Sequence, residues 1–304
     1  MKPGLPDAIA SAPPRGWRIW WTAARPRTLS IAVTPVALGT AIAWSEGVAH
    51  AWLPALAALL CALLIQAATN LHNDAADFER GNDTPERVGP LRVTAAGWAT
   101  PAQVRAAAFA TFGAAFALGI YLAGVGGWPI VAIGLASLAA GWAYSGGPRP
   151  ISHTPFGEVF VFAFFGLCAV GGSYWLQAAR LSAAALLGGA ALGSLAAGVL
   201  MVNNYRDLAG DTKAGRRTLA AALGPGAARR AFAAMMLAPF AAPLWFAAQG
   251  RPGALLAFGA LPACAGVVLR IARGEHGPVL NLLLAATARA GLLFGLLLAV
   301  GVLL

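Results

Sequence analysis

Long apolar stretches alternate with short polar segments along the whole chain of 304 residues. Each apolar stretch is close to the roughly 20 residues that a helix needs to cross a bilayer. The stretches are rich in Ala, Leu and Gly and show no period-2 alternation, which argues against a transmembrane barrel. The pattern therefore predicts an all-α, polytopic membrane protein that forms a single domain over residues 1–304. We expect about nine transmembrane helices, over residues 28–45, 52–72, 103–124, 127–145, 156–177, 181–204, 229–248, 253–272 and 279–303.

The composition supports a location in lipid. Hydrophobic residues make up 59% of the chain and charged residues only 11%, whereas soluble domains carry about 25% charged residues. The three cysteines, Cys61, Cys168 and Cys264, fall inside predicted spans and lack the spacing of a metal site. They are therefore interpreted as small apolar packing residues.

The basic residues are distributed unevenly between the two sides of the predicted topology. A net charge of +10 would by itself suggest a nucleic-acid partner. However, all but three of the 21 Lys and Arg residues lie on one side, the exceptions being Arg180, Arg251 and Arg289. This is the positive-inside pattern of membrane proteins. It argues against nucleic acid, predicts a multi-pass protein of the cell (inner) membrane, and places the N-terminal segment 1–25 and the larger loops in the cytoplasm.

The scarce acidic residues are concentrated in two short segments that follow the second and sixth predicted spans. Closely spaced carboxylates repel one another, and the C-terminal end of a helix disfavours anions. Solvated loop acids are the alternative, but a bound cation would relieve both penalties. Of the eleven Asp and Glu residues, seven belong to these segments: Asp74, Asp77, Glu79, Asp83 and Glu86 in the first, and Asp207 and Asp211 in the second.

The residue types in the two segments point to a divalent metal. Carboxylate and amide oxygens are hard donors, which suit Mg²⁺, Mn²⁺ or Ca²⁺, and Mg²⁺ commonly completes its shell with substrate phosphates. At helical spacing, the polar residues of each segment share one face. Candidate metal ligands are Asn73, Asp74, Asp77, Asp83, Asn204, Asp207 and Asp211, of which Asp74, Asp77, Asp207 and Asp211 are the candidate catalytic residues.

A diphosphate is the predicted partner of that metal. Basic residues around both segments, Arg92 and Arg217 included, could neutralise phosphate charge, although some of them serve only the positive-inside pattern. Neither GxxxxGK[ST] nor GxGxxG occurs, so a nucleotide fold gets no support. The candidate diphosphate-binding residues are Asn70, Asn73, Arg80, Arg87, Arg206, Lys213 and Arg216.

The two motifs together resemble those of the UbiA superfamily of intramembrane prenyltransferases. Asn73-Asp-x-x-Asp77 with Asp83 is similar to the first motif of that family, and Asp207-x-x-x-Asp211 to the second, within a resemblance over nearly the whole chain. Further segments resemble the menaquinone branch of the family, with Arg216 standing where that branch often has Lys. These segments are Arg25-Pro-Arg-Thr-Leu29, Tyr144-Ser-Gly-Gly-Pro148, Gly157-Glu158 and Ala214-Gly-Arg-Arg-Thr-Leu219.

The resemblance implies a fold and a reaction. It implies helices around a central cavity, in which Mg²⁺ held by the four aspartates binds a polyprenyl diphosphate. The polyprenyl group would then pass to an aromatic acceptor, 1,4-dihydroxy-2-naphthoate, with loss of CO₂ and diphosphate to give demethylmenaquinone. Acceptors such as 4-hydroxybenzoate, homogentisate or heme remain alternatives. Replacing any of the four aspartates by Ala should then abolish turnover and leave expression near normal.

Other polar residues are candidates for binding the acceptor. Arg289 falls inside an apolar span, where a charge is costly and often functional. Each candidate has a simpler explanation, as an interfacial residue or one paired at a helix end. A secondary transporter is a further alternative, but its polar residues should lie near the midplane. The acceptor candidates are Tyr144, Arg149, Glu158 and Arg289, while the prenyl chain length and the oligomeric state are left open.

Overall fold

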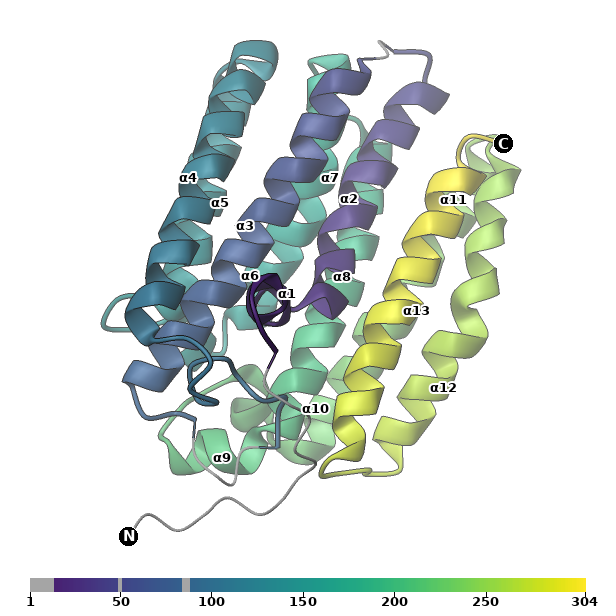
Figure 1. Ribbon diagram of the computed structural model, residues 1–304. Coiled ribbons are helices and arrows are strands. Elements are labelled where there is room, and N and C mark those ends of the chain that lie inside the picture. The colour runs from purple at the N-terminus through teal and green to yellow at the C-terminus, as the bar shows by residue number, and fades with distance from the viewer. Residues whose placement is uncertain (1–13, 49–50, 84–87) are drawn as a thin grey trace, which may run out of the picture.

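The computed structural model describes residues 14–48, 51–83 and 88–304, whose longer helices run side by side in one bundle (Figure 1). In this part of the chain, nine helical units are long and apolar enough to cross a membrane, which confirms the predicted multi-pass, all-α class. Six units are single helices: α2 (Pro26–Ser45), α3 (Trp52–Glu79), α4 (Pro101–Gly126), α5 (Trp128–Ser145), α8 (Ala183–Arg206) and α13 (Val279–Gly301).

Three units consist of consecutive segments: α6 (Gly157–Val161), η2 (Phe162–Cys168) and α7 (Ala169–Ala178); α10 (Leu219–Leu237), η3 (Ala238–Phe240) and α11 (Ala241–Ala248); and η4 (Pro252–Ala260) with α12 (Leu261–Ala272). Prolines mark two of the breaks, because proline removes a backbone donor and clashes with the preceding turn. Pro239 lies within η3, and Pro262 lies in the first turn of α12, where η4 ends. The segment η2 is a π-helix, a wide turn that is frequent at functional sites.

Two helices differ from their predicted bounds in ways that affect the acidic motifs. The helix predicted at 52–72 continues to Glu79, so the first motif lies on α3 itself rather than after it. The span predicted at 229–248 begins earlier, at Leu219, because Gly224 with φ 73 allows the chain to kink before Pro225. The second motif falls across the end of α8 and the short α9 (Leu208–Lys213).

α8, whose end carries the second motif, is packed deep in the bundle. Of the 18 most apolar consecutive residues of α8, 72% are buried. Gly166 of η2 faces Gly189 and Gly193 of α8, and a Cβ added at Gly166 would lie 2.4 Å from the carbonyl oxygen of Gly189. Small residues at such contacts let transmembrane helices approach closely. These glycines therefore fix α8 against the unit formed by α6, η2 and α7.

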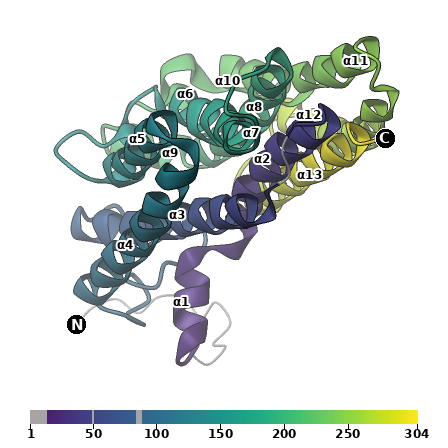
Figure 2. The ribbon, with the colours of Figure 1, turned by 90° about the horizontal axis from the view of Figure 1, so that it is seen from above.

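A short helix outside the bundle lies near the first motif. This helix, α1 (Trp17–Ala24), projects from the bundle across the direction of the long helices (Figure 2). Arg25 joins it to α2 with a left-handed φ of 54, a conformation that is uncommon for a residue with a side chain. The side chain of Asn70 donates hydrogen bonds to the Ala24 carbonyl (2.8 Å) and to Thr28 Oγ1 (3.2 Å). The junction between α1 and α2 is thereby attached to α3.

At the other end of the bundle a single carboxylate gathers two arginines. Glu46, at the end of α2, accepts a hydrogen bond from Tyr174 and pairs with Arg180 (3.8 Å) and Arg251 (3.6 Å). These are the two loop arginines that the topology placed opposite the acidic motifs. Their shared carboxylate ties three loops together at the end of the bundle where the chain terminates (Figure 1).

Candidate active site

A cavity of about 850 Å³ reaches from the acidic motifs deep into the bundle. At one end it is lined by Asn73 and Asp77 of α3 and by Asp207 and Asp211 of the second motif. Farther in, its walls come from α3, α4, α5, η2 and α7 and are mainly apolar. Both acidic motifs therefore open onto one cavity that also offers an apolar interior.

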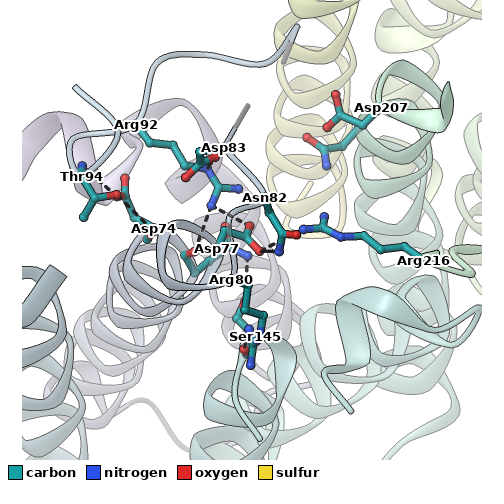
Figure 3. Close-up of polar contacts among 12 residues, drawn as sticks. Asp74, Asp77, Arg80, Asn82, Asp83, Arg92, Thr94, Ser145, Asp207 and Arg216 are labelled. Atoms are coloured by element: carbon teal, nitrogen blue, oxygen red, sulfur yellow. Dashed lines mark hydrogen bonds and ion pairs between the residues drawn. The ribbon is translucent and has the colours of Figure 1, made fainter. Parts of the chain in front are cut away.

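Asp77 is the centre of a network of charges at the polar end (Figure 3). It is 4% exposed. Arg92 Nη1 lies 2.6 Å from its Oδ2, and Arg216 Nη2 lies 3.2 Å from its Oδ1, which also accepts a hydrogen bond from Asn82 (3.0 Å). Arg92 continues to Asp83 through Nε at 3.3 Å. Two guanidinium groups thus compensate the buried carboxylates of the first motif.

Arg216 connects the first motif to the second. Its Nη1 lies 3.3 Å from Asp211 Oδ1, while its Nη2 contacts Asp77. Burial raises the pKa of Asp211 to about 6, although Arg216 opposes this rise and the Asp207 carboxylate adds to it. The two motifs are therefore joined by a cation, and the side chain that supplies it comes from the segment after α9.

The donor set at this end fits a divalent cation. Within the described residues, no three acidic, histidine or cysteine side chains gather into a ready-made metal group. Instead, the guanidinium groups of Arg92 and Arg216 stand between Asp77, Asp83 and Asp211. The carboxylate oxygens of these aspartates thus already bind cationic groups, and such hard oxygen donors are the ligand type that suits Mg²⁺.

Asp74 has a different environment from that expected of a metal ligand. It is 1% exposed and does not line the cavity. Its carboxylate accepts hydrogen bonds from the backbone N–H groups of Val93 and Thr94, both at 3.1 Å, and from Thr94 Oγ1 at 2.5 Å. The spacing predicted that Asp74 shares the face of Asp77. In the structure, the Asp74 carboxylate instead meets the loop that precedes α4. Its metal-binding and catalytic assignment gets no support from this geometry.

Asp207 is held by its sequence neighbour. Arg206 binds it through Nε (2.8 Å) and Nη2 (2.5 Å) and also donates to Asn203 Oδ1 and Asn281 Oδ1, each at 2.9 Å. Asn281, at the start of α13, donates to the Val88 carbonyl at 2.8 Å. Arg206 therefore positions Asp207 and links α8 to α13.

Most of the predicted diphosphate-binding residues lie at the polar end, but several are already engaged. Arg80 donates to the carbonyls of Ser145 (2.5 Å) and Gly147 (3.0 Å), away from the cavity lining. Asn73 donates to Ser145 Oγ at 2.7 Å and lines the cavity, as do Asn70, Arg206, Lys213 and Arg216. Arg87 lies outside the described residues. Arg216 and Lys213 are thus the cations best placed for an anion in the cavity.

The four acceptor candidates separate into two pairs. Tyr144 lines the cavity. Glu158 is 2% exposed and lies just behind the cavity lining, where it accepts a hydrogen bond from Asn204 Nδ2 at 2.9 Å. Asn204 lines the cavity but binds Glu158, so its predicted role as a metal ligand has no support here. Arg149 and Arg289 are exposed and do not line the cavity.

Arg289 therefore does not face the cavity, as a residue that binds the acceptor would. Its Nε donates to the Ala285 carbonyl of its own helix at 3.3 Å, and the side chain lies on the outer surface of α13. We expect Arg289→Gln to leave kcat/KM for the acceptor within about twofold, as for other surface substitutions away from a site. Steady-state kinetics in detergent would check this, and a loss of acceptor affinity would place Arg289 in the site after all.

Sequence reasoning missed several residues that organise the site. Val93 and Thr94 hold Asp74 largely through backbone groups, which leave no signal in residue types. Asn281 carried a weak signal, as a polar residue at the edge of an apolar span. Arg25 lines the cavity and donates to Asn73 Oδ1 at 3.4 Å. It appeared only as part of a motif that heads the first span.

The fold and the cavity together define a multi-pass membrane protein with two acidic motifs at the mouth of an apolar chamber. The model of the UbiA prenyltransferase family matches residues 32–279. The chain belongs to the UbiA prenyltransferase family, as the motifs predicted.

Relatives and solved structures agree with this assignment. A 1,4-dihydroxy-2-naphthoate octaprenyltransferase of Bacillus subtilis is 33% identical over 293 residues, which cover 94% of this chain and 93% of the relative. A 1,4-dihydroxy-2-naphthoate octaprenyltransferase of Mycobacterium tuberculosis is 38% identical over 218 residues, 71% of this chain and 74% of the relative. The structure of a UbiA homolog from Archaeoglobus fulgidus bound to GPP and Mg²⁺ shares the fold, with a TM-score of 0.64, 17% identity and coverage of 94% and 99%.

Proposed function

We propose that this single-domain chain transfers a polyprenyl group from a polyprenyl diphosphate to 1,4-dihydroxy-2-naphthoate, releasing CO₂ and diphosphate and giving demethylmenaquinone. The observation that carries the proposal is one cavity with a charged end and a long apolar interior. A donor that joins a diphosphate to a hydrocarbon tail has the same division. Each buried CH₂ of such a tail contributes about 0.8 kcal/mol, so the apolar walls favour a prenyl donor over a free phosphate.

Mg²⁺ is the metal that we propose for the charged end, with Mn²⁺ as a substitute. Asp77, Asp207 and Asp211 would hold it, with Asn73 as a neutral oxygen donor beside Asp77. Asp83 pairs with Arg92 and does not line the cavity, so we leave it out of the ligand set. Bound metal would stabilise the negative charge that develops on the departing diphosphate. The A. fulgidus homolog, solved with GPP and Mg²⁺, supports this choice.

The arginines of the site have a second role in this proposal. With divalent cations on the aspartates, Arg216 becomes available to the diphosphate, and Lys213 lies on the same cavity wall. An arginine fork fits phosphate oxygens in a bidentate manner. Arg216 therefore compensates the carboxylates before the substrate arrives and the diphosphate afterwards.

Replacing Arg216 by Ala should weaken binding of the donor more than binding of the acceptor. We expect KM for the prenyl diphosphate to rise about tenfold or more, since charge-assisted hydrogen bonds contribute about 1.5–3 kcal/mol. The neighbouring Arg217→Ala is the matched control, because Arg217 is exposed and does not line the cavity. Equal donor KM values in the two variants would contradict the proposed diphosphate contact.

For the acceptor, we propose that Tyr144 contacts the aromatic ring or its substituents, and that Glu158 acts through Asn204, which lines the cavity. Glu158 Oε2 is buried and has no hydrogen-bond partner among the described residues, and such a group usually has one. Arg149 and Arg289 are left out because they lie away from the cavity. The names of the B. subtilis and M. tuberculosis relatives support the naphthoate over other aromatic acceptors.

A panel of acceptors tests the proposed function directly. Purified protein in detergent, with Mg²⁺ and a polyprenyl diphosphate, is offered 1,4-dihydroxy-2-naphthoate, 4-hydroxybenzoate or homogentisate. We expect diphosphate and CO₂ to be released in equal amounts with the naphthoate alone. Turnover of 4-hydroxybenzoate without turnover of the naphthoate would overturn the proposed acceptor but not the prenyl transfer.

We also propose the cell membrane as location, with the acidic end of the bundle at the cytoplasmic face. The basic residues are gathered at that end, and Arg180 and Arg251 meet Glu46 at the other. Cysteine labelling of intact cells would check this: a cysteine introduced next to Arg251 should react with an impermeant reagent, whereas one next to Lys213 should not.

A further inference from the structure

The apolar part of the cavity follows α3 for most of its length. Cavity-lining residues recur on one face of this helix from Asp77 back to Ala58, a distance of roughly 28 Å at 1.5 Å per residue. That length approaches the thickness of the hydrocarbon core of a bilayer, about 30 Å. The cavity is therefore long in one direction, with the charged motifs at its mouth.

The far end of the cavity is lined by a small apolar cluster. Leu122 of α4, Ile130 of α5 and Leu176 of α7 are 5%, 7% and 9% exposed and pack together with Ala57 of α3. The first three also line the cavity. They come from the ends of three spans near the short connection between α4 and α5, so they form a floor opposite the acidic motifs.

Two glycines line the cavity just above this floor. Gly119 of α4 and Gly134 of α5 both line the cavity. A Cβ built at either glycine meets no atom within 4 Å. Gly119 precedes Leu122 by one helical turn, so the two residues share a face of α4. The open space beside these glycines is thus part of the same channel that Leu122 helps to line.

We infer that Leu122, Ile130 and Leu176 set the longest prenyl chain that this enzyme encloses, and that the space at Gly119 and Gly134 holds the distal isoprene units. This inference rests on the proposed function, because the tail in question is that of the polyprenyl donor. Burial of the tail is proportional to the apolar area removed from water. In a channel that ends at a packed floor, each added isoprene unit therefore increases the binding free energy only until the tail reaches the floor.

A side chain placed at Gly119 should shorten the channel without disturbing the fold. Leu is a better helix former than Gly, and a Cβ at this position meets no atom within 4 Å. We expect Gly119→Leu to lower kcat/KM for octaprenyl diphosphate about tenfold or more, since a few methylene groups that lose burial already amount to that factor. Turnover of geranyl diphosphate, which is too short to reach the floor, should fall much less, so that the ratio of kcat/KM for the long donor to that for the short one drops.

Gly113→Leu is the matched control on the same helix. Gly113 also has open space around a built Cβ, but it does not line the cavity. This variant should give the wild-type ratio of kcat/KM for the long donor to that for the short one. Equal ratios in Gly119→Leu and Gly113→Leu would overturn the inference and indicate that long tails leave the channel for the bilayer.

A second variant tests the floor from the other direction. Leu176→Ala should raise the ratio of kcat/KM for octaprenyl diphosphate to that for geranyl diphosphate relative to the wild type, and an unchanged or lower ratio would count against the floor. All assays use 1,4-dihydroxy-2-naphthoate as acceptor with the full-length chain. If the wild type turns over neither donor, the proposed function fails, and this result is distinct from a ratio that does not respond to Gly119→Leu.

Discussion

Asp77→Asn is expected to abolish prenyl transfer while the protein remains folded. The substitution keeps the shape of the side chain but removes the carboxylate that Arg92 and Arg216 share. Both arginines retain another partner, Asp83 and Asp211 respectively, so no buried charge is left uncompensated. Loss of groups that merely orient a metal ligand costs about 10–100-fold in activity, and loss of a ligand itself should exceed about 100-fold.

Mg²⁺-dependent release of diphosphate is the measurement, and Glu79→Gln is the control. Glu79 lies on the same helix, but its side chain is 42% exposed and pairs with Arg105 at 2.5 Å, outside the cavity. We expect this variant to retain activity close to that of the wild type. Full Mg²⁺-dependent activity in Asp77→Asn would refute the metal assignment of the first motif.

Asp74→Ala should act mainly on stability. The variant leaves the N–H groups of Val93 and Thr94 without their buried acceptor. Hydrogen bonds to a charged group contribute about 1.5–3 kcal/mol each, and a buried group left unsatisfied adds a penalty. We therefore expect the free energy of unfolding to fall by about 3–5 kcal/mol, with a lower Tm in detergent and a lower yield.

Thr94→Val separates the contributions to this contact. It replaces only the hydroxyl, which donates to the Asp74 carboxylate, and should cost about 1.5–3 kcal/mol, the range for one hydrogen bond to a charged group. If Asp74→Ala instead unfolded at the wild-type temperature but lost Mg²⁺-dependent turnover, Asp74 would belong with the metal ligands. The motif alone predicted equal effects for all four aspartates, whereas the geometry predicts a loss of activity for Asp77 and a loss of stability for Asp74.

The fold class was readable from the sequence because lipid leaves few alternatives. Every backbone polar group in the hydrocarbon must be satisfied, so a long apolar run is nearly always a helix. The clustering of acids was readable too, since charges are rare in such a chain. The ends of the helices were harder to predict from the sequence. α3 continues through polar residues to Glu79 because the loop around Arg92 and Thr94 covers that last part of the helix.

The partners within the site could not be read from spacing. Asp74 and Asp77 are both Asp residues on one helix, yet one meets backbone N–H groups and the other meets arginines. Which partner each one has depends on where the loop at 88–100 returns, and side-chain periodicity carries no information on that. The exposure of Arg289 was likewise hidden, because a single charge in an apolar span gives no direction around the helix axis.

The two contacts that organise the first motif also differ in when they can form during synthesis of the chain. Thr94 follows Asp74 by 20 residues, whereas Arg216 follows Asp77 by 139. Short loops close at lower entropic cost than long ones, and the N-terminal part of a chain leaves the ribosome first. The clamp on Asp74 can therefore assemble while the later spans are still being inserted. Until Arg216 is made, Asp77 relies on Arg92 alone. A nascent chain that stalls after α4 would therefore carry the contacts around Asp74 but neither the Arg216 contact to Asp77 nor the second motif.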